Sequence, residues 1–236
     1  MISKDSLCIA LDGSDRSWIV STARALGNDV GWLKIGLEAF IAHGPALVEE
    51  VAAIGPRIFL DLKLHDIPAT VRRAAANCAR CGASMLTVHA GGGRRMLEAA
   101  VEGACEASRT EPPRVVAVTV LTSLDGSALE ELGFHRPPHD VVLGWARLAR
   151  ECALAGVVAS AQEAAAVRQA CGGGFLIVTP GIRPATSDRD DQRRILTPAE
   201  AIQAGADILV VGRPVTRAPD SAAVARSIVE EMTSTV

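Results

Sequence analysis

Short runs of apolar residues alternate along the chain with longer stretches in which apolar positions repeat at helical spacing. The apolar runs are continuous, as in strands that are buried on both faces of a parallel sheet. They predict eight strands, at 7–11, 31–35, 57–62, 85–89, 115–120, 156–159, 175–179 and 208–211. The helical spacing predicts helices at 15–26, 37–54, 68–81, 92–108, 139–153, 161–171, 198–204 and 214–232.

Two of the predicted helices begin with a clear local signal. Ser160 and Thr197 are each followed three residues later by a glutamate, which is the pattern of a capping box. Eight strand-helix units in 236 residues predict an α/β fold, a (β/α)8 barrel or TIM barrel, with a doubly wound open sheet as the alternative. No linker, charge block or low-complexity segment divides the chain, so a single domain over residues 1–236 is expected.

The third predicted strand ends in charged residues. Asp61 and Lys63 follow its apolar run, and because side chains alternate across a strand, we expect them on one face. Asp66 comes next, just before Pro68 begins a helix. Burying a carboxylate and an ammonium is costly unless they are paired or take part in chemistry. The alternative is purely structural: an ion pair between Asp61 and Lys63, and an N-cap at Asp66.

Polar residues also stand where other predicted strands end, and in a barrel this is the end that carries the chemistry. They are Asp12, Lys34, His89, Thr122 and Ser123. Of these, His89 is interpreted as a hydrogen-bonded structural residue. The histidines and cysteines show no ligand spacing that predicts a metal site.

The loops after the seventh and eighth strands predict a phosphate site. Their candidate residues are Gly181, Arg183, Gly212 and Arg213. Glycine lets backbone N–H groups approach an anion, the start of a helix favours negative charge, and the arginines add cations. The alternative is two tight turns with solvated arginines. The long polar segment 184–196, which contains Gln192, is expected to be a lid over an anionic ligand or a solvated loop.

Composition narrows the class of protein. Hydrophobic residues make up 49% of the chain, and its net charge of −3 gives no support for nucleic-acid or membrane-surface binding. The first residues lack the features of a signal peptide and no apolar run is long enough to cross a bilayer, so a cytoplasmic protein with reduced thiols is expected. Cys78 and Cys81 have redox or metal spacing, but without a second pair they are interpreted as helix packing.

A phosphate site on one side leaves the lysines and carboxylates for the reacting part of the ligand. A Schiff-base role for Lys63 would need a depressed pKa, whereas flanking carboxylates favour the ammonium. An ammonium in this position suits protonation and stabilisation of a developing carbanion, and a fixed carboxylate beside it would repel a carboxylate of the substrate. The pattern therefore suggests decarboxylation of a phosphorylated substrate without a cofactor.

These segments resemble the orotidine 5′-phosphate decarboxylase family. The resemblance is strongest in Asp61-Leu-Lys63-Leu-His-Asp66-Ile-Pro-Ala-Thr70 and spans nearly the whole chain. The further matching segments are Ala10-Leu-Asp12, Lys34-Ile-Gly, Val88-His-Ala, Val118-Thr-Val-Leu-Thr122-Ser123, Thr179-Pro-Gly-Ile-Arg183-Pro, Asp191-Gln192-Arg-Arg and Val211-Gly-Arg213-Pro-Val.

The resemblance implies a homodimeric barrel that converts orotidine 5′-monophosphate to UMP, the last step of de novo pyrimidine nucleotide synthesis, with no metal or organic cofactor. It implies that Lys63 protonates C6 of the pyrimidine, that Asp61 lies against the departing carboxylate, and that Lys34 completes the charge network and contacts the ribose. Asp66 and Thr70 would reach into the partner subunit's active site. The other implied contacts are Asp12 with the ribose, Thr122 and Ser123 with the pyrimidine edge, and Arg183, Gln192, Gly212 and Arg213 with the phosphate.

Two alternatives stay open at this stage. One is a Mg²⁺-dependent sugar-phosphate decarboxylase or aldolase of the same broader barrel group, which uses a related Asp-x-Lys-x-x-Asp motif. The other is a catalytically inactive protein that binds nucleotide phosphates. The intact pair of Asp61 and Lys63 argues against the second alternative.

Overall fold

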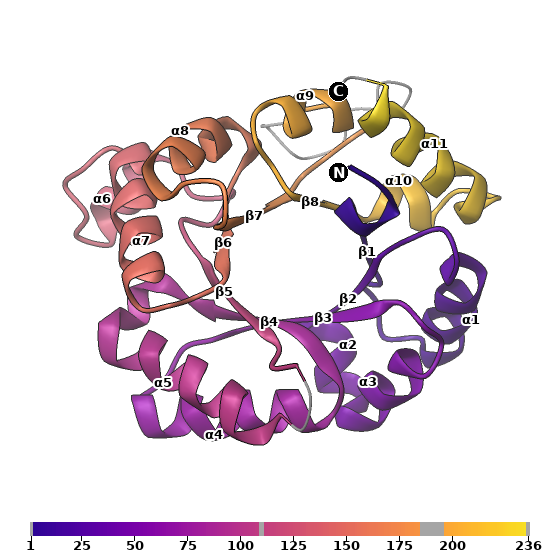
Figure 1. The fold of residues 1–236 in the computed structure, drawn as a ribbon, viewed down its shortest axis with the longest axis horizontal. Helices are drawn as coiled ribbons and strands as arrows, with labels where there is room; N and C mark the ends of the chain where they lie inside the picture. Colours follow the sequence, from indigo (N-terminus) through magenta and orange to yellow (C-terminus); the bar gives the residue numbers. More distant parts are fainter. Residues whose placement is uncertain (1, 109–110, 185–195, 235–236) are drawn as a thin grey trace.

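Eight parallel strands close into a barrel in the computed structural model of the chain (Figure 1). The structure describes residues 2–108, 111–184 and 196–234. The strands are β1 (Leu7–Ala10), β2 (Trp32–Gly36), β3 (Arg57–Leu64), β4 (Ala83–His89), β5 (Arg114–Val118), β6 (Gly156–Val158), β7 (Leu176–Pro180) and β8 (Ile208–Val211). Each strand pairs with the next, and β1 also pairs with β8. The predicted (β/α)8 barrel is confirmed, and the open-sheet alternative is wrong because its two edge strands would not pair.

Helices surround this ring of strands (Figure 1). They are α1 (Arg16–Leu26), α2 (Leu37–His43), α3 (Pro45–Ala52), α4 (Pro68–Arg80), α5 (Gly93–Ala107), α6 (Gly126–Glu131), α7 (Pro138–Glu151), α8 (Ala161–Cys171), α9 (Pro198–Gln203), α10 (Arg213–Thr216) and α11 (Ser221–Thr233), with short 3-10 turns at Lys4–Ser6 and Ala90–Gly92. Both predicted capping boxes are present, at Ser160 before α8 and at Thr197 before α9.

Three parts of the helix prediction differ from the structure. The segment 37–54 forms two helices, because Gly44 has a φ of 64° that no α-helix accommodates and Pro45 begins α3. The segment 214–232 is divided between α10 and α11, and the Asp220 side chain caps the start of α11. Helix α6 has no counterpart in the prediction, since six residues are too few to show a helical period.

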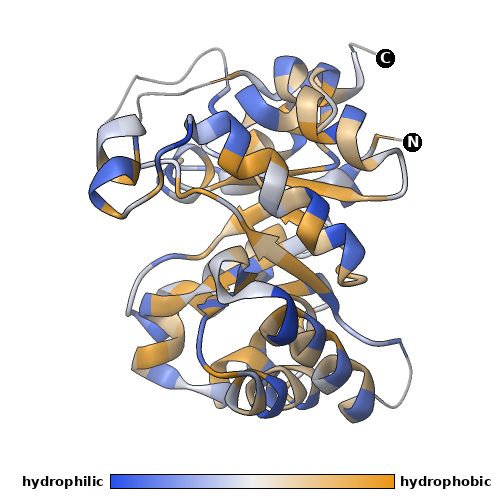
Figure 2. Ribbon diagram, turned by 90° about the vertical axis from the view of Figure 1, so that its left-hand side faces the viewer, coloured by the Kyte–Doolittle hydropathy of each residue, from blue (hydrophilic) through white to orange (hydrophobic). Residues whose placement is uncertain are grey.

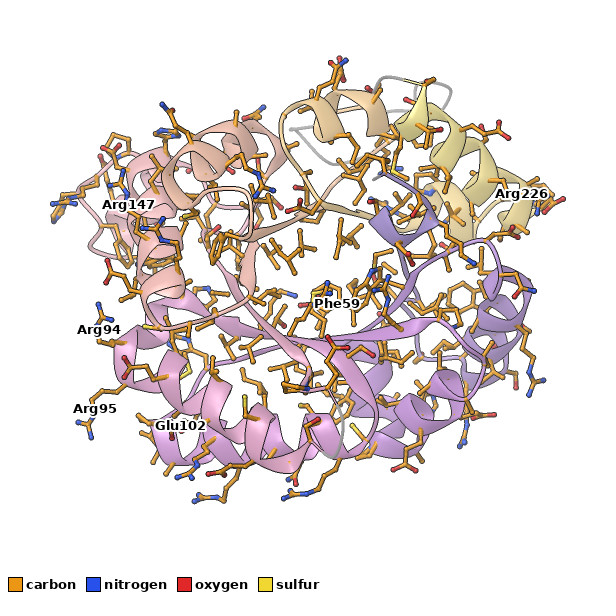
Figure 3. The ribbon with its side chains drawn as sticks, in the orientation of Figure 1. Phe59, Arg94, Arg95, Glu102, Arg147 and Arg226 are labelled. Carbon is orange, nitrogen blue, oxygen red and sulfur yellow. The ribbon has the colours of Figure 1, made fainter. Side chains whose placement is uncertain are left out.

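Apolar side chains form two cores on the two sides of the sheet. The inner core fills the barrel and includes Trp32 and Phe59; Figure 3 shows Phe59 at the centre of the ring. The outer core joins the strands to the helices, and it contains Cys78 and Cys81, which confirms their interpretation as packing residues. Burial on both faces explains why the strands are mostly apolar, as their predominantly orange colour in Figure 2 shows.

Candidate active site

The inward face of three neighbouring strands changes from apolar to polar toward its carboxyl end. The alternate inward positions of β2, β3 and β4 run from Trp32, Phe59 and Met85 to Lys34, Asp61 and Thr87. Lys34 and Thr87 are buried, with 8% and 0% of their surface exposed. A layer of polar groups therefore lies directly on the inner core, at the end of the barrel where enzymes of this fold carry their active sites.

The charged members of this layer form a continuous network around one carboxylate. Lys63 Nζ lies 2.8 Å from Asp61 Oδ2, and Lys34 Nζ lies 3.6 Å from the same oxygen. Lys34 Nζ also donates a hydrogen bond of 2.8 Å to Asp12 Oδ1. The four residues that the sequence placed at the ends of strands 1, 2 and 3 are thus brought together, with the two ammonium groups sharing Asp61.

The use of lysine in this network is selective. The chain contains only three lysines, Lys4, Lys34 and Lys63, among 24 basic residues, so two of the three belong to the network. Arginine is always charged in proteins, whereas a lysine ammonium is a compact group that can give up a proton. The choice of lysine at these two positions fits a site that needs a small cation beside a carboxylate and a group that transfers a proton.

Electrostatic interactions within the network hold its buried groups in their charged forms. Burial alone would raise the pKa of Asp61, but the nearby Lys34 and Lys63 and hydrogen bonds from Lys63 and Thr87 outweigh it and lower that pKa. Burial alone would lower the pKa of Lys34, but Asp12 and Asp61 outweigh it and raise that pKa. The site therefore presents a fixed carboxylate next to a fixed ammonium at neutral pH.

The backbone at Lys63 is not that of a regular strand, so strand alternation alone does not explain the contact with Asp61. Its backbone has a φ of 49°, in the left-handed region that residues other than glycine seldom adopt. The pairing of β3 with β4 is interrupted at this point, between the pairs Leu60↔Leu86 and Leu64↔Val88. The prediction that the two charges meet is confirmed, but an irregularity at the end of β3 brings them together.

Two cavities meet at this network. One, of about 210 Å³, is lined by Lys34, Asp61 and Lys63 together with apolar residues of β5 and β6 and with Thr122. The other, of about 320 Å³, is lined by Asp12, Lys34 and Asp61 on one side and by the loops after β7 and β8 on the other. Lys34 and Asp61 line both cavities, so one ligand with two dissimilar ends could occupy them together.

The second cavity contains the residues predicted for a phosphate. Gly181, Arg183, Gly212 and Arg213 all line it, Arg183 is 8% exposed, and Gly181 has a φ of 80°. Two cations therefore border the cavity from two separate loops. Gln192 lies outside the described residues, as does most of the predicted lid 184–196.

Of the two residues predicted to contact the pyrimidine, Thr122 and Ser123, only one lines a cavity of the site. Thr122, in the loop after β5, lines the smaller cavity beside Lys63. Ser123 is exposed and is not among the residues that line either cavity. The structure thus brings Thr122, but not Ser123, to the site in this conformation.

Comparison with known proteins agrees with this geometry. The model of a family described as "Orotidine 5'-phosphate decarboxylase / HUMPS family" matches residues 5–228. The chain belongs to this family. A protein of Moorella thermoacetica named orotidine 5'-phosphate decarboxylase is 51% identical, with 98% of this chain and 94% of that protein covered. A relative of the same name from Anaeromyxobacter sp. (strain K) is also 51% identical, with 97% of this chain and 98% of that protein covered.

The fold is shared with a solved orotidine 5'-phosphate decarboxylase. The crystal structure of orotidine 5'-phosphate decarboxylase from Lactobacillus acidophilus superposes with a TM-score of 0.87 at 35% identity, covering 96% of this chain and 98% of that one. The resemblance drawn from the sequence motifs is therefore confirmed at the level of the family, over nearly the full length of the chain.

Two residues of the decarboxylase motif, Asp66 and Thr70, do not line either cavity of their own chain. Asp66 is exposed, and within the described residues it makes no ion pair with Lys34 or Lys63. The N-cap of α4 is Ile67, so the structural alternative of Asp66 as N-cap is wrong; its Oδ1 accepts a hydrogen bond of 2.6 Å from the Ile67 backbone N–H. Thr70 lies in the first turn of α4 and lines neither cavity.

Two further residues of this decarboxylase-family site have no counterpart in the sequence analysis. The Thr87 hydroxyl donates to Asp61 Oδ1 at 2.9 Å. A Cβ at Gly36 would lie 2.9 Å from Asp12 Oδ1 and 3.1 Å from Lys34 Nζ, so glycine leaves room for that ion pair. A lone polar residue at an inward position of an apolar strand was the available signal for Thr87; the sequence holds none for Gly36.

His89 of this family member has the structural role that was predicted. Its Nδ1 accepts a hydrogen bond of 3.1 Å from the Gly91 backbone N–H, and its ring stacks on His65 and meets the edge of Trp145. Burial, and then the nearby His65 and Lys63, lower the pKa of His89. In the described part of the chain, no group of three or more His, Cys, Asp or Glu side chains is arranged to bind a metal ion.

A larger cavity of about 750 Å³ lies at the other end of the barrel, where β3, β4 and β5 begin. Its Arg57 already pairs with Asp5 and stacks on Trp32 at 4.1 Å. Because Lys34, Lys63 and Asp61 lie at the opposite end, the smaller cavities remain the candidate active site of this orotidine 5'-phosphate decarboxylase / HUMPS family member. None of its described helices is long and apolar enough to cross a lipid bilayer.

Proposed function

We propose that the chain catalyses the decarboxylation of orotidine 5′-monophosphate to UMP, as the last step of de novo pyrimidine nucleotide synthesis, and that its 236 residues act as one barrel domain. The observation that carries the proposal is the position of Asp61, which is shared by Lys34 and Lys63 where the two cavities meet. The cavity of about 210 Å³ has the mixed lining that a pyrimidine needs, and the cavity of about 320 Å³ has the cations that a phosphate needs. The description of the matching family and the name of the Moorella thermoacetica relative support orotidine 5′-monophosphate as the substrate.

In the proposed reaction the bond between C6 and the carboxyl carbon breaks, carbon dioxide leaves, and the electron pair stays on C6. The Lys63 ammonium then donates its proton to C6. Asp61 lies against the departing carboxylate, and Lys34 holds Asp61 and contacts the ribose. Stabilisation of the developing carbanion by an ammonium already in position lowers the barrier, and it requires no strain in the bound substrate.

The remaining contacts assign the two ends of the substrate. Asp12 binds a ribose hydroxyl, and Thr122 and Ser123 bind the pyrimidine edge, Ser123 by a movement of its exposed loop. The phosphate is bound by Arg183, Gly212 and Arg213. Their common position around the cavity of about 320 Å³ supports this assignment. Gln192 is assigned to the phosphate on the sequence resemblance alone.

We also propose that the enzyme is a homodimer whose partner subunits share their active sites through Asp66 and Thr70. The support is the exposure of Asp66 beside Ile67, an isoleucine that is 66% exposed. Two further apolar side chains of α2, Leu37 and Ile41, are 46% and 79% exposed. Exposed apolar side chains such as these are typical of a surface that another protein chain covers.

The cytoplasm is the proposed location, with no metal and no organic cofactor in the reaction. A spectrophotometric assay with orotidine 5′-monophosphate tests the reaction and the cofactor requirement together, since product formation changes the ultraviolet absorbance of the base. We expect turnover that EDTA leaves unchanged. No turnover of orotidine 5′-monophosphate, together with EDTA-sensitive turnover of a sugar phosphate, would support the Mg²⁺-dependent sugar-phosphate decarboxylase or aldolase. UMP binding without any turnover would support the inactive nucleotide binder.

The Lys63→Ala variant tests the assignment of the proton donor. We expect it to lose decarboxylation while it retains UMP binding, because the other contacts remain. Lys4→Ala is the matched control, since Lys4 is the one lysine outside the network and donates only to the Asn28 carbonyl oxygen among the described groups. Wild-type turnover in Lys63→Ala would refute the assignment.

Subunit mixing tests the shared site. Asp66→Asn and Lys63→Ala should each be inactive alone and should regain partial activity when mixed, because one site of each mixed dimer then has both wild-type residues. Mass spectrometry of the intact dimers verifies the exchange of subunits. If exchange is complete and activity does not return, Asp66 does not act across the interface.

A further inference from the structure

Thr87 occupies the one position on β4 that faces the irregular end of β3. Between the pairs Leu60↔Leu86 and Leu64↔Val88, β3 carries three residues while β4 carries only Thr87. A regular ladder of backbone hydrogen bonds cannot form over this mismatch. The two residues that carry the proposed chemistry, Asp61 and Lys63, both lie within it.

The Thr87 side chain supplies the hydrogen bonds that the ladder lacks. Its Oγ1 accepts a bond of 2.8 Å from the Lys63 backbone N–H and donates one of 2.9 Å to Asp61 Oδ1. A hydroxyl has a single proton, and an ionised carboxylate only accepts hydrogen bonds. The hydroxyl proton must therefore point at Asp61, which leaves an oxygen lone pair for the Lys63 N–H.

These two bonds fix different parts of the reacting pair. The bond to Lys63 holds a backbone whose φ of 49° is unfavourable for a residue with a Cβ. The bond to Asp61 fixes the carboxylate oxygen that neither lysine contacts, since both lysines approach Oδ2. Thr87 has no exposed surface, so water does not compete for either bond.

We propose that Thr87 is a positioning residue, whose hydroxyl holds Asp61 and Lys63 in the geometry that decarboxylation requires. The inference rests on the proposed function for its kinetic consequence, but its structural consequence stands independently. Thr87 does not contact the substrate in this scheme, because Asp61 and Lys63 line the cavity and Thr87 does not. It acts through the orientation of these two residues.

Substitution by valine and by serine separates the hydroxyl from the shape of the side chain. Thr87→Val keeps the shape of the side chain and removes both hydrogen bonds. We expect kcat to fall about tenfold or more, because the reaction rate drops steeply when a catalytic group is displaced. The KM should change much less, because the phosphate contacts are intact. Thr87→Ser keeps the hydroxyl and should restore most of kcat.

The pH profile distinguishes positioning from packing. The hydrogen bond from Thr87 is one of the interactions that lower the pKa of Asp61. In Thr87→Val the acid limb of kcat should therefore move to higher pH, and in Thr87→Ser it should stay in place. Thr119→Val is the matched control, because Thr119 is equally buried and its hydroxyl donates only to the Val158 carbonyl oxygen at 2.9 Å.

A measurement without turnover keeps the inference apart from the proposed function. Protein with ¹³C-labelled lysine contains three labelled residues. We expect Thr87→Val, but not Thr119→Val, to shift the signal that Lys63→Ala removes, while the Lys4 signal stays unchanged. An unmoved Lys63 signal overturns the inference whether or not the wild type decarboxylates orotidine 5′-monophosphate, and so does a kcat in Thr87→Val equal to that of the wild type. A wild type without turnover overturns the proposed function instead.

Discussion

Gly36 gives a direct test of how closely the ion pair of Asp12 and Lys34 must be held. Alanine at this position would place its Cβ 2.9 Å from Asp12 Oδ1 and 3.1 Å from Lys34 Nζ. Ordinary contacts of a Cβ begin near 3.4 Å, so the carboxylate and the ammonium must each give way by several tenths of an ångström. The hydrogen bond of 2.8 Å between them is the contact that this displacement breaks.

The size of the effect follows from that one contact. A hydrogen bond between charged groups contributes about 1.5–3 kcal/mol, so its complete loss from the bound state would lower kcat/KM by about 10- to 100-fold. The fold itself should be unaffected, because Gly36 has a φ of −93° and a ψ of −177°, which alanine adopts freely. The loss of chain entropy in the unfolded state even predicts a gain of about 0.4–1 kcal/mol in the free energy of unfolding.

Steady-state kinetics and thermal unfolding of Gly36→Ala measure both quantities on the same preparation. Gly144→Ala is the control, since Gly144 lies in α7 and its added Cβ meets no atom within 4 Å. We expect the control to keep wild-type kinetics. A wild-type kcat/KM in Gly36→Ala would show that the pair tolerates displacement. A large loss of thermal stability would show that the backbone, rather than the two charged side chains, gives way.

Three further predictions concern the phosphate, the fold and the effect of pH. Arg213→Ala should raise KM by about 10- to 100-fold with little change in kcat, since it removes a contact present before and during the reaction; an unaltered KM would exclude Arg213 from the phosphate site. Arg168→Ala should lower the free energy of unfolding in urea by about 2–3 kcal/mol, because its guanidinium joins the Phe175 carbonyl oxygen at 2.7 Å to Asp207 at 2.6 Å. Since the pKa of Asp61 is lowered by folding, its stabilising contribution is complete above its ordinary value of 3.8 and disappears as the pH falls through the folded value. Acid unfolding of Asp61→Asn should lack this component, and an identical pH dependence in both proteins would contradict it.

The barrel was predictable because each strand is buried on both faces. A continuous apolar run needs no knowledge of distant partners, and all eight predicted runs became strands of the barrel. The strand ends then place Asp12, Lys34 and Asp61 at one end of the barrel as a consequence of the fold alone. The same reasoning placed Arg183 and Arg213 around a common cavity, although they are far apart in sequence.

The sequence alone did not predict the roles of Thr87 and Gly36 or the backbone conformation of Lys63. These features depend on contacts between strands that a single stretch of sequence does not encode. The sequence marks Thr87 only as a lone polar residue in an apolar strand, and its role depends on the mismatch opposite it on β3. The role of Gly36 depends on where the Asp12 side chain lies, beyond the end of a neighbouring strand. The left-handed backbone of Lys63 is likewise a tertiary effect, because no local preference of lysine favours a φ of 49°.

The two lysines of the network differ in surroundings, in the way that their proposed roles require. The Lys34 side chain is 10% exposed and lies between two carboxylates, which raise its pKa, so it is a fixed charge. The Lys63 side chain is 33% exposed and, within the described residues, forms an ion pair with one carboxylate, that of Asp61. A proton donor must recover its proton from solvent after each turnover, and only Lys63 has the exposed surface for this. The structure thus separates a buried lysine that fixes Asp61 from an accessible lysine that can donate a proton, and this division supports Lys63 rather than Lys34 as the donor to C6.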